Sequence, residues 1–221
     1  MSDFEGLNLE RQSGIIPTSV IQNIKVTIIG VGAIGSHVAK QLSQIGIRDL
    51  KVYDFDTIEE HNLPNQGFGL PDLGKPKVLA VKDRLELDYG VKVEARAEKV
   101  DADTKFDTEI VISAVDSMAA RKAIWDSVKA SSDVSVFLDA RMGAMYAEAY
   151  SVSLESEDSI KGYEDTLFDD SEGYRAPCTE KSTIFCAAGT SAVLSSMVAA
   201  YAMKTLKPKK VEIDWARFLM S

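Results

Sequence analysis

A glycine-rich turn supplies the first residues whose types and spacing could do chemistry. Gly30, Gly32 and Gly35 form the pattern G-x-G-x-x-G, directly after an apolar run at residues 25–30 and before a helical pattern. In such a turn the first glycine permits a tight bend, the second lets a phosphate approach the backbone, and the third lets helix and strand pack closely. Exposed amides at the start of the following helix favour an anion. The turn therefore predicts a nucleotide phosphate site.

An acid follows at the distance that a bound ribose would require. Asp54 ends a second apolar run at residues 50–53, nineteen residues after Gly35. A carboxylate in that position can accept hydrogen bonds from both ribose hydroxyls. NAD and ATP satisfy the pattern equally well, so an NAD-dependent oxidoreductase and an ATP-binding enzyme both remain open at this point.

A longer motif favours ATP. Residues 52–66 read V-Y-D-F-D-T-I-E-E-H-N-L-P-N-Q, and G-K-P-K follows at residues 74–77. This string resembles the D-x-D-x-V-x-x-x-N-L-x-R-Q and G-x-x-K motifs of the ubiquitin-activating-enzyme superfamily, which includes the adenylyltransferases of thiamin and molybdopterin synthesis. The resemblance runs from about Arg11 to Lys204. It implies an enzyme that transfers AMP from ATP to the C-terminal carboxylate of a small ubiquitin-like or sulfur-carrier protein.

The resemblance also implies roles for individual residues. Asp54 would bind the ribose, Asn62 would help to position the phosphates, and Lys77 would neutralise the α-phosphate during in-line attack. A lysine at a helix N-terminus is disfavoured by the helix dipole, so a phosphate partner explains Lys77 better than a surface role does. The expected nucleotide-binding residues are Gly30, Gly32, Ala33, Gly35, Asp54, Asp56, Asn62, Asn65 and Lys77.

Three further residues complete the expected catalytic set with Lys77. Asp116 ends the run E-I-V-I-S-A-V-D, and Arg121 follows five residues later, which resembles the D-N-x-x-x-R element whose aspartate holds Mg²⁺. A hard cation needs such a carboxylate. Arg11, in E-R-Q, resembles the arginine that reaches the phosphates of a neighbouring subunit. Cys178, in A-P-C-T, resembles the cysteine that forms a thioester after adenylation, and a thiol near a helix N-terminus is readily ionised.

Two departures from the motifs weaken the resemblance. Asn65 occupies the place of the arginine in N-L-x-R-Q, which removes a cation that would bind phosphate, so Lys75 or Arg141 would have to substitute for it. Ala33 replaces the second glycine of a Gly-Gly pair. A relative that binds ATP without adenylating anything therefore stays open, as does an inert role for Cys178. Cys186 lies in an apolar run and is predicted to be core packing.

The elements that must position these residues alternate along the chain. Apolar runs predict strands, and helical spacing predicts helices, in the order expected of a doubly wound, Rossmann-like, mainly parallel α/β sheet. Residues 145–154 alternate in character and predict an antiparallel extension. A short helix is expected around residues 9–12, and a final strand or tail at residues 211–220. The expected strands are 25–30, 50–53, 91–95, 109–114 and 134–139, and the expected helices 36–45, 77–87 and 117–129.

The whole chain, residues 1–221, is expected to form a single adenylation-type domain. Residues 155–172 carry eight acids, so residues 155–180 are predicted to be a mobile crossover loop. The net charge of -9 argues against a nucleic-acid partner. The first residues, M-S-D-F-E, resemble no targeting segment, so a cytoplasmic location is expected. Residues 182–203 lack charge, but their serines and threonines favour a buried helix or a homodimer interface over a membrane span.

Overall fold

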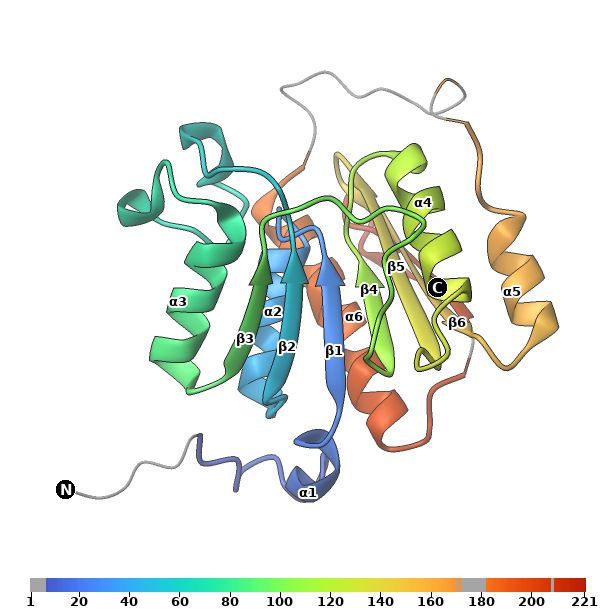
Figure 1. Cartoon of the computed structure of the whole chain (residues 1–221), viewed down its shortest axis with the longest axis horizontal. Coiled ribbons are helices and arrows are strands. Elements are labelled where there is room, and N and C mark those ends of the chain that lie inside the picture. The colour runs from blue at the N-terminus through green and yellow to red at the C-terminus, as the bar shows by residue number, and fades with distance from the viewer. Residues whose placement is uncertain (1–6, 170, 172–181, 208) are drawn as a thin grey trace.

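The computed structural model describes residues 7–169, 171, 182–207 and 209–221. These described residues contain an eight-stranded sheet in the order β3-β2-β1-β4-β5-β6-β7-β8 (Figure 1). Neighbouring strands from β3 to β5 pair in parallel, and those from β5 to β8 pair antiparallel. The predicted doubly wound, mainly parallel sheet with an antiparallel extension is therefore confirmed. The strands are β1 Lys25–Ile29, β2 Asp49–Tyr53, β3 Lys92–Arg96, β4 Ile110–Ser113, β5 Val136–Gly143, β6 Tyr146–Ser153, β7 Lys209–Asp214 and β8 Leu219–Met220.

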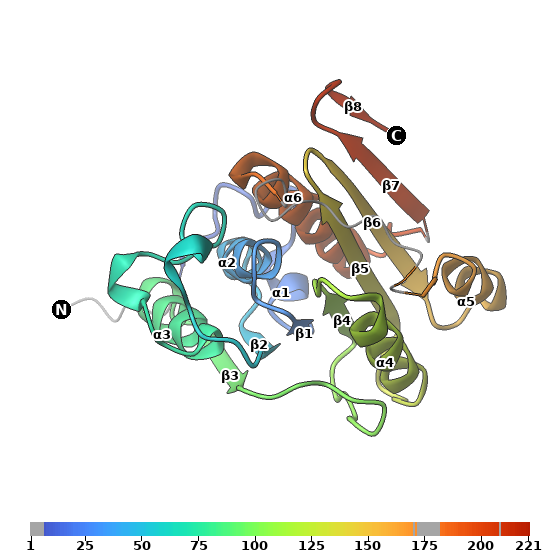
Figure 2. The same ribbon diagram turned by 90° about the horizontal axis from the view of Figure 1, so that it is seen from above.

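Helices cover both faces of the parallel part of the sheet, which explains why its strands are apolar without alternation. On one face, α2 (Gly35–Ile45), α3 (Lys77–Tyr89) and α6 (Ile184–Ala202) enclose the larger core. On the other face, α4 (Met118–Lys129) and α5 (Glu157–Glu164) enclose a core rich in aromatic rings (Figure 2). The three predicted helices before residue 130 all form, and Gly46 ends α2 in a left-handed conformation with φ of 114°.

The N-terminal segment differs from its prediction. Residues 9–16 form hydrogen-bonded turns in place of a helix, with Gln12 N donating to the Leu9 carbonyl over 3.1 Å. The first helix, α1, is the single turn Thr18–Ile21, which begins after Pro17. Proline fixes a backbone angle that suits a helix start, and this local constraint outweighs the weak helical pattern around residue 11.

The acidic segment also differs, because α5 lies inside the stretch that was predicted to be a mobile loop. Ser156 caps the helix by accepting a hydrogen bond from Ser159 N over 3.2 Å, and Glu157 and Asp158 occupy its first turn. Acids are favourable there because the helix dipole is positive at that end. Tyr163 anchors the helix, since it is 2% exposed and packs edge-on against three rings, those of Trp125, Phe137 and Tyr150.

The long uncharged helix α6 is partly buried against the sheet and α2. Ser191 Oγ donates to the Ile34 carbonyl over 2.9 Å, and Ser195 Oγ donates to Gln41 Oε1 over 2.9 Å. By length and composition alone α6 could cross a membrane, and half of its apolar window is buried inside the fold. The prediction of a buried helix is confirmed by these contacts. A homodimer interface on its other side stays a prediction.

Candidate active site

The glycine turn lies where the strand order reverses, with β2 on one side of β1 and β4 on the other. Gly30 has φ of +85°, and a Cβ there would lie 2.7 Å from the Ala114 carbonyl oxygen. A Cβ at Gly35 would lie 1.8 Å from the Gly30 carbonyl oxygen. At Gly32 the nearest atom to a Cβ would be Gln66 Nε2, 4.0 Å away. Backbone atoms therefore leave no room for a side chain at Gly30 or Gly35. Gly32 instead borders open space just before α2, and the half-buried Ala33 follows it.

Asp54 joins this turn to the end of β2. Its Oδ2 accepts a hydrogen bond from Val31 N over 2.8 Å, and its Oδ1 accepts one from Asp56 N over 2.9 Å. The side chain is 9% exposed, and burial raises the pKa of the Asp54 carboxyl despite these two donors and the nearby Lys77. Asp54 therefore holds the turn in shape before any nucleotide arrives, in addition to the ribose role that the sequence predicted.

Lys77 is brought to the same edge as the first residue of α3. Its side chain is 8% exposed, and its Nζ lies 2.8 Å from Asp56 Oδ2. The backbone is tied as well, because Lys77 N donates to the Asp56 carbonyl over 3.0 Å. The sequence predicted both residues separately and missed that they form a pair. The Asp56 carboxylate neutralises the Lys77 ammonium. Because Asp56 is half exposed, a phosphate could reach this position and take its place.

The loop from residue 59 to residue 67 covers the side of the turn. Asn62 is buried and its Oδ1 accepts from Glu59 N over 2.9 Å, which shapes a 3-10 turn at Glu60–Asn62. Asn65 Nδ2 donates to Ser182 Oγ over 2.5 Å, so this side chain bridges to the residue two before α6. Gln66 Oε1 is buried with no hydrogen-bond partner among the described residues, and the Gln66 amide lies beside Gly32. An unsatisfied polar atom next to an open turn fits a ligand site.

Asp116 lies in the turn after β4, and its side chain is exposed. The turn is adjacent to the glycines, because Ala114 N donates to the Ile29 carbonyl over 2.8 Å. No group of three or more His, Cys, Asp or Glu side chains that could hold a metal occurs in the part of the chain that the structure describes. Mg²⁺ commonly binds through one or two carboxylates and the phosphates of its substrate, so a single carboxylate at this edge fits Mg²⁺ with ATP.

The two bases suggested as substitutes for the missing arginine have other partners. Arg141 donates from Nε to Asp139 Oδ2 over 3.0 Å and from Nη1 to the Thr166 carbonyl over 3.0 Å. Lys75 Nζ lies 3.5 Å from Asp72 Oδ1. Arg141 therefore ties β5 to the segment after α5, and a phosphate-binding role for Arg141 or Lys75 stays a prediction.

Arg11 lies near the amino ends of the parallel strands, whereas the glycine turn lies at their carboxyl ends. Its neighbour Gln12 donates from Nε2 to the Ile45 carbonyl over 2.7 Å, and the Leu9 side chain approaches Gly46. Both contacts are at the far end of α2, whose 11 residues span about 16 Å. Figure 1 shows this segment below the strands, away from the edge where β1 and β2 end. Arg11 does not join the glycine turn of its own chain, and its action in a neighbouring subunit stays a prediction.

The structure describes only one of the two cysteines, Cys186. Cys178 lies outside the described residues, so its thioester role stays a prediction. Cys186 is fully buried in the first turn of α6, and burial raises the pKa of its thiol to about 11. The expectation that Cys186 is core packing is confirmed by its burial.

We expect Cys186 to resist alkylation in the folded protein at pH 8. With its pKa near 11, the thiolate fraction is roughly a hundredfold below that of an ordinary thiol. The measurement is iodoacetamide labelling, quantified by mass spectrometry separately for the peptides that contain Cys178 and Cys186. Labelling in urea is the control, where both peptides should react. Fast labelling of Cys186 in the folded protein would contradict its placement.

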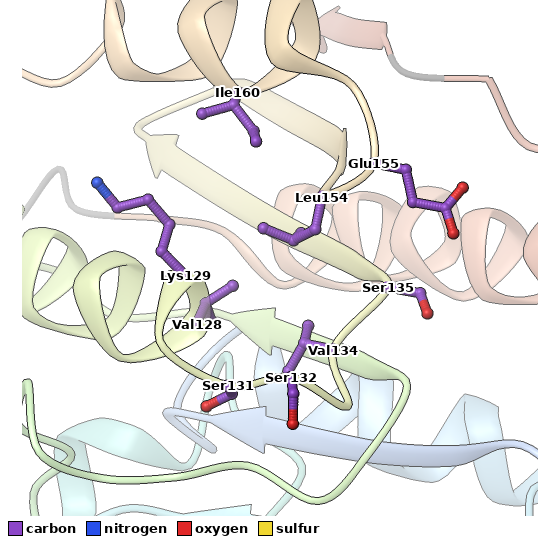
Figure 3. Close-up of a pocket in the computed structure, with 9 residues that line it drawn as sticks. All are labelled: Val128, Lys129, Ser131, Ser132, Val134, Ser135, Leu154, Glu155 and Ile160. Atoms are coloured by element: carbon purple, nitrogen blue, oxygen red, sulfur yellow. The ribbon is translucent and has the colours of Figure 1, made fainter.

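A separate hollow of about 500 Å³ lies at the amino ends of the central strands. Figure 3 shows its lining, which comes from the end of α4, the approach to β5 and the residues after β6. None of the residues predicted for nucleotide binding contributes to it. The hollow is therefore separate from the proposed nucleotide site. Its lining residues are Val128, Lys129, Ser131, Ser132, Val134, Ser135, Leu154, Glu155 and Ile160.

Comparison with known sequences finds a matching family and several relatives. The sequence profile of the ThiF family matches residues 9–219. The NEDD8-activating enzyme E1 catalytic subunit of Arabidopsis thaliana is 36% identical over 106 residues, covering 46% of this chain and 23% of the relative. Ubiquitin-like modifier-activating enzyme 5 of Dictyostelium discoideum is 29% identical over 121 residues, covering 47% of this chain and 32% of the relative. The chain thus spans about a quarter to a third of the length of these relatives.

Solved structures share the fold over nearly the whole chain. The crystal structure of PaaA superposes with a TM-score of 0.75 at 19% identity, covering 96% of this chain and 67% of the other. The crystal structure of E. coli MccB with ATP superposes with a TM-score of 0.68 at 20% identity, covering 92% of this chain and 64% of the other. At these identities the likeness concerns the fold.

Proposed function

This chain belongs to the ThiF family, and we propose that it binds ATP and adenylates the C-terminal carboxylate of a small ubiquitin-like or sulfur-carrier protein. One observation carries the proposal. The open glycine turn, the buried Asp54 and the ammonium of Lys77 converge on one edge of the sheet. An open anion site with a neighbouring buried cation suits a reaction whose main demands are positioning and charge stabilisation.

The proposed reaction assigns one task to each group. The amides around Gly32 at the start of α2 hold a phosphate, and Asp54 accepts hydrogen bonds from the ribose hydroxyls. A carboxylate oxygen of the partner attacks the α-phosphorus, the bond from that phosphorus to the oxygen bridging the β-phosphate breaks, and acyl-AMP and pyrophosphate result. Lys77 exchanges Asp56 for the α-phosphate and stabilises the negative charge that builds there. Asp116 would hold Mg²⁺ together with the phosphates, and the bound metal would supply electrostatic stabilisation of the leaving pyrophosphate.

Two finer features belong to the same proposal. The acyl-AMP is attacked by the thiolate of Cys178, which forms a thioester and releases AMP. The chain also works as a homodimer in which Arg11 reaches the phosphates of the neighbouring subunit. Support for the homodimer comes from the position of Arg11, whose chain neighbours Leu9 and Gln12 contact the end of α2 that is far from the glycine turn.

The proposal is tested by ATP–pyrophosphate exchange that depends on a partner protein. Candidate partners are short proteins that end in Gly-Gly and whose genes lie next to the gene for this chain. We expect radiolabelled pyrophosphate to enter ATP only when such a partner is present, and a partner lacking its last two glycines is the matched control. Tight binding of NADH without binding of ATP would favour the alternative NAD-dependent oxidoreductase.

A non-catalytic ATP-binding relative is the second candidate, and Asn65 favours it. Asn65 occupies the position of the arginine in the family motif, and its side chain donates a hydrogen bond to Ser182. The Asn65→Arg variant separates the two candidates. If exchange appears in the variant and is absent from the wild-type chain with every Gly-Gly partner, the non-catalytic function is correct.

A further inference from the structure

A buried carboxylate outside the nucleotide site joins two arginines. Asp139, in β5, is 0% exposed, and its Oδ1 accepts from Arg121 Nε over 2.7 Å. Its Oδ2 accepts from Arg141 Nε over 3.0 Å and from the Tyr163 hydroxyl over 3.1 Å. Burial raises the pKa of Tyr163, so this hydroxyl keeps its proton and remains a donor. Buried charges are costly and seldom add stability over an apolar core, so this cluster calls for a role beyond folding.

The first arginine holds the turn that carries Asp116. Arg121 Nη2 donates to the Val115 carbonyl over 2.8 Å, and its Nη1 lies 3.5 Å from the Ser117 carbonyl oxygen. These two residues flank Asp116. Val115 also borders the glycine turn, because its Cγ1 lies 3.3 Å from where a Cβ at Gly30 would be. The position of the Asp116 turn therefore depends on the guanidinium of Arg121.

The second arginine holds the end of α5. Arg141 donates from Nη1 to the Thr166 carbonyl over 3.0 Å and from Nη2 to Thr166 Oγ1 over 2.9 Å. Tyr163, inside α5, bonds the same Asp139. A continuous series of contacts thus runs from the glycine turn through Asp139 to α5.

We propose that Asp139 is a positioning residue for Mg²⁺ binding, an inference that rests on the proposed function. Through Arg121 it fixes the turn in which Asp116 receives the metal of MgATP. Through Arg141 and Tyr163 it makes that position depend on the docking of α5. Two fixed guanidinium groups, each bonded to backbone carbonyls, give this arrangement a geometric precision that a single ion pair would lack.

The inference is tested by calorimetric titration of the full chain with ATP, once in excess Mg²⁺ and once in EDTA. Arg121→Lys keeps the charge and loses the bond to Val115. We expect it to lower the gain in ATP affinity that Mg²⁺ confers by about tenfold or more, as substitutions behind a metal ligand do. The affinity for metal-free ATP should stay unchanged. Tyr163→Phe keeps the ring packing but loses the hydrogen bond to Asp139. It should also lower the gain in ATP affinity that Mg²⁺ confers, by a smaller factor than Arg121→Lys.

A matched control separates positioning from simple loss of stability. Val152→Ala loosens the same aromatic core and removes no hydrogen bond to Asp139. It should lower the thermal midpoint and leave unchanged the gain in ATP affinity that Mg²⁺ confers. The inference is overturned if Arg121→Lys and Tyr163→Phe behave like Val152→Ala, or if Mg²⁺ confers no gain on the wild-type chain. A wild-type chain that binds no ATP in either condition would instead overturn the proposed function.

Discussion

Replacing Lys77 by methionine is expected to lower partner-dependent ATP–pyrophosphate exchange by about a hundred- to a thousandfold, the range seen when one group that stabilises transition-state charge is removed. Methionine keeps the apolar stem of a side chain that is only 8% exposed, so the packing at the start of α3 should survive. The partner left behind, Asp56, is half exposed and can be solvated by water. The loss should therefore appear in the rate and not in the fold.

The exchange assay with saturating partner measures this effect, and Lys82→Met is the matched control. Lys82 lies five residues later on α3, is 35% exposed and pairs with Glu86. An exposed ion pair contributes little, so exchange by the control should stay within about twofold of wild type. Equal activity of the two variants, both folded by circular dichroism, would remove Lys77 from the reaction.

The second large effect is expected from Gly35→Ala, which should prevent stable folding. The new Cβ would lie 1.8 Å from the Gly30 carbonyl oxygen and 2.9 Å from its carbon, and neither atom belongs to a side chain that could rotate away. A clash with backbone at the point where β1 meets α2 places the loss in the exceptional range above about 4 kcal/mol. Urea unfolding of the soluble fraction measures it, and a wild-type midpoint would show that the turn is wider than described.

Gly32→Ala provides the contrast at the same turn. Its Cβ would meet only Gln66 Nε2, at 4.0 Å, so stability should change by less than about 1 kcal/mol. The methyl group would occupy the space that a phosphate needs, and ATP affinity should fall by at least about tenfold, or 1.4 kcal/mol. Unchanged ATP binding by this folded variant would place the phosphate elsewhere.

Much of the fold follows from local patterns in the sequence. The runs that form β1 and β4 are apolar without interruption because helices cover both faces of the sheet, and the helical spacing of α2 ends at a glycine that tolerates positive φ. Composition is a poor guide for α5, because a high density of acidic residues predicts a loop where the structure has a helix. The sequence did contain a signal there, since Ser156 followed by two acids is a helix start.

The site could be predicted in part, because parallel strands end at one edge of a sheet. This rule places Gly30, Asp54 and Asp116 close together in space although they lie far apart in the sequence. It says nothing about which of these side chains bond one another. The Lys77–Asp56 pair and the bonds of Asp139 to Arg121 and Tyr163 depend on packing between distant segments, which local spacing does not encode.

The separation of Arg11 from the glycine turn has a consequence for dosage. In the proposed homodimer each active site uses Arg11 of the second copy, so an isolated chain lacks this one side chain. The fraction of complete centres then rises with the total concentration of the chain, as in any assembly governed by mass action. Below the dissociation constant of the dimer, output would grow with the square of the amount of protein, so a modest change in expression would have a disproportionate effect.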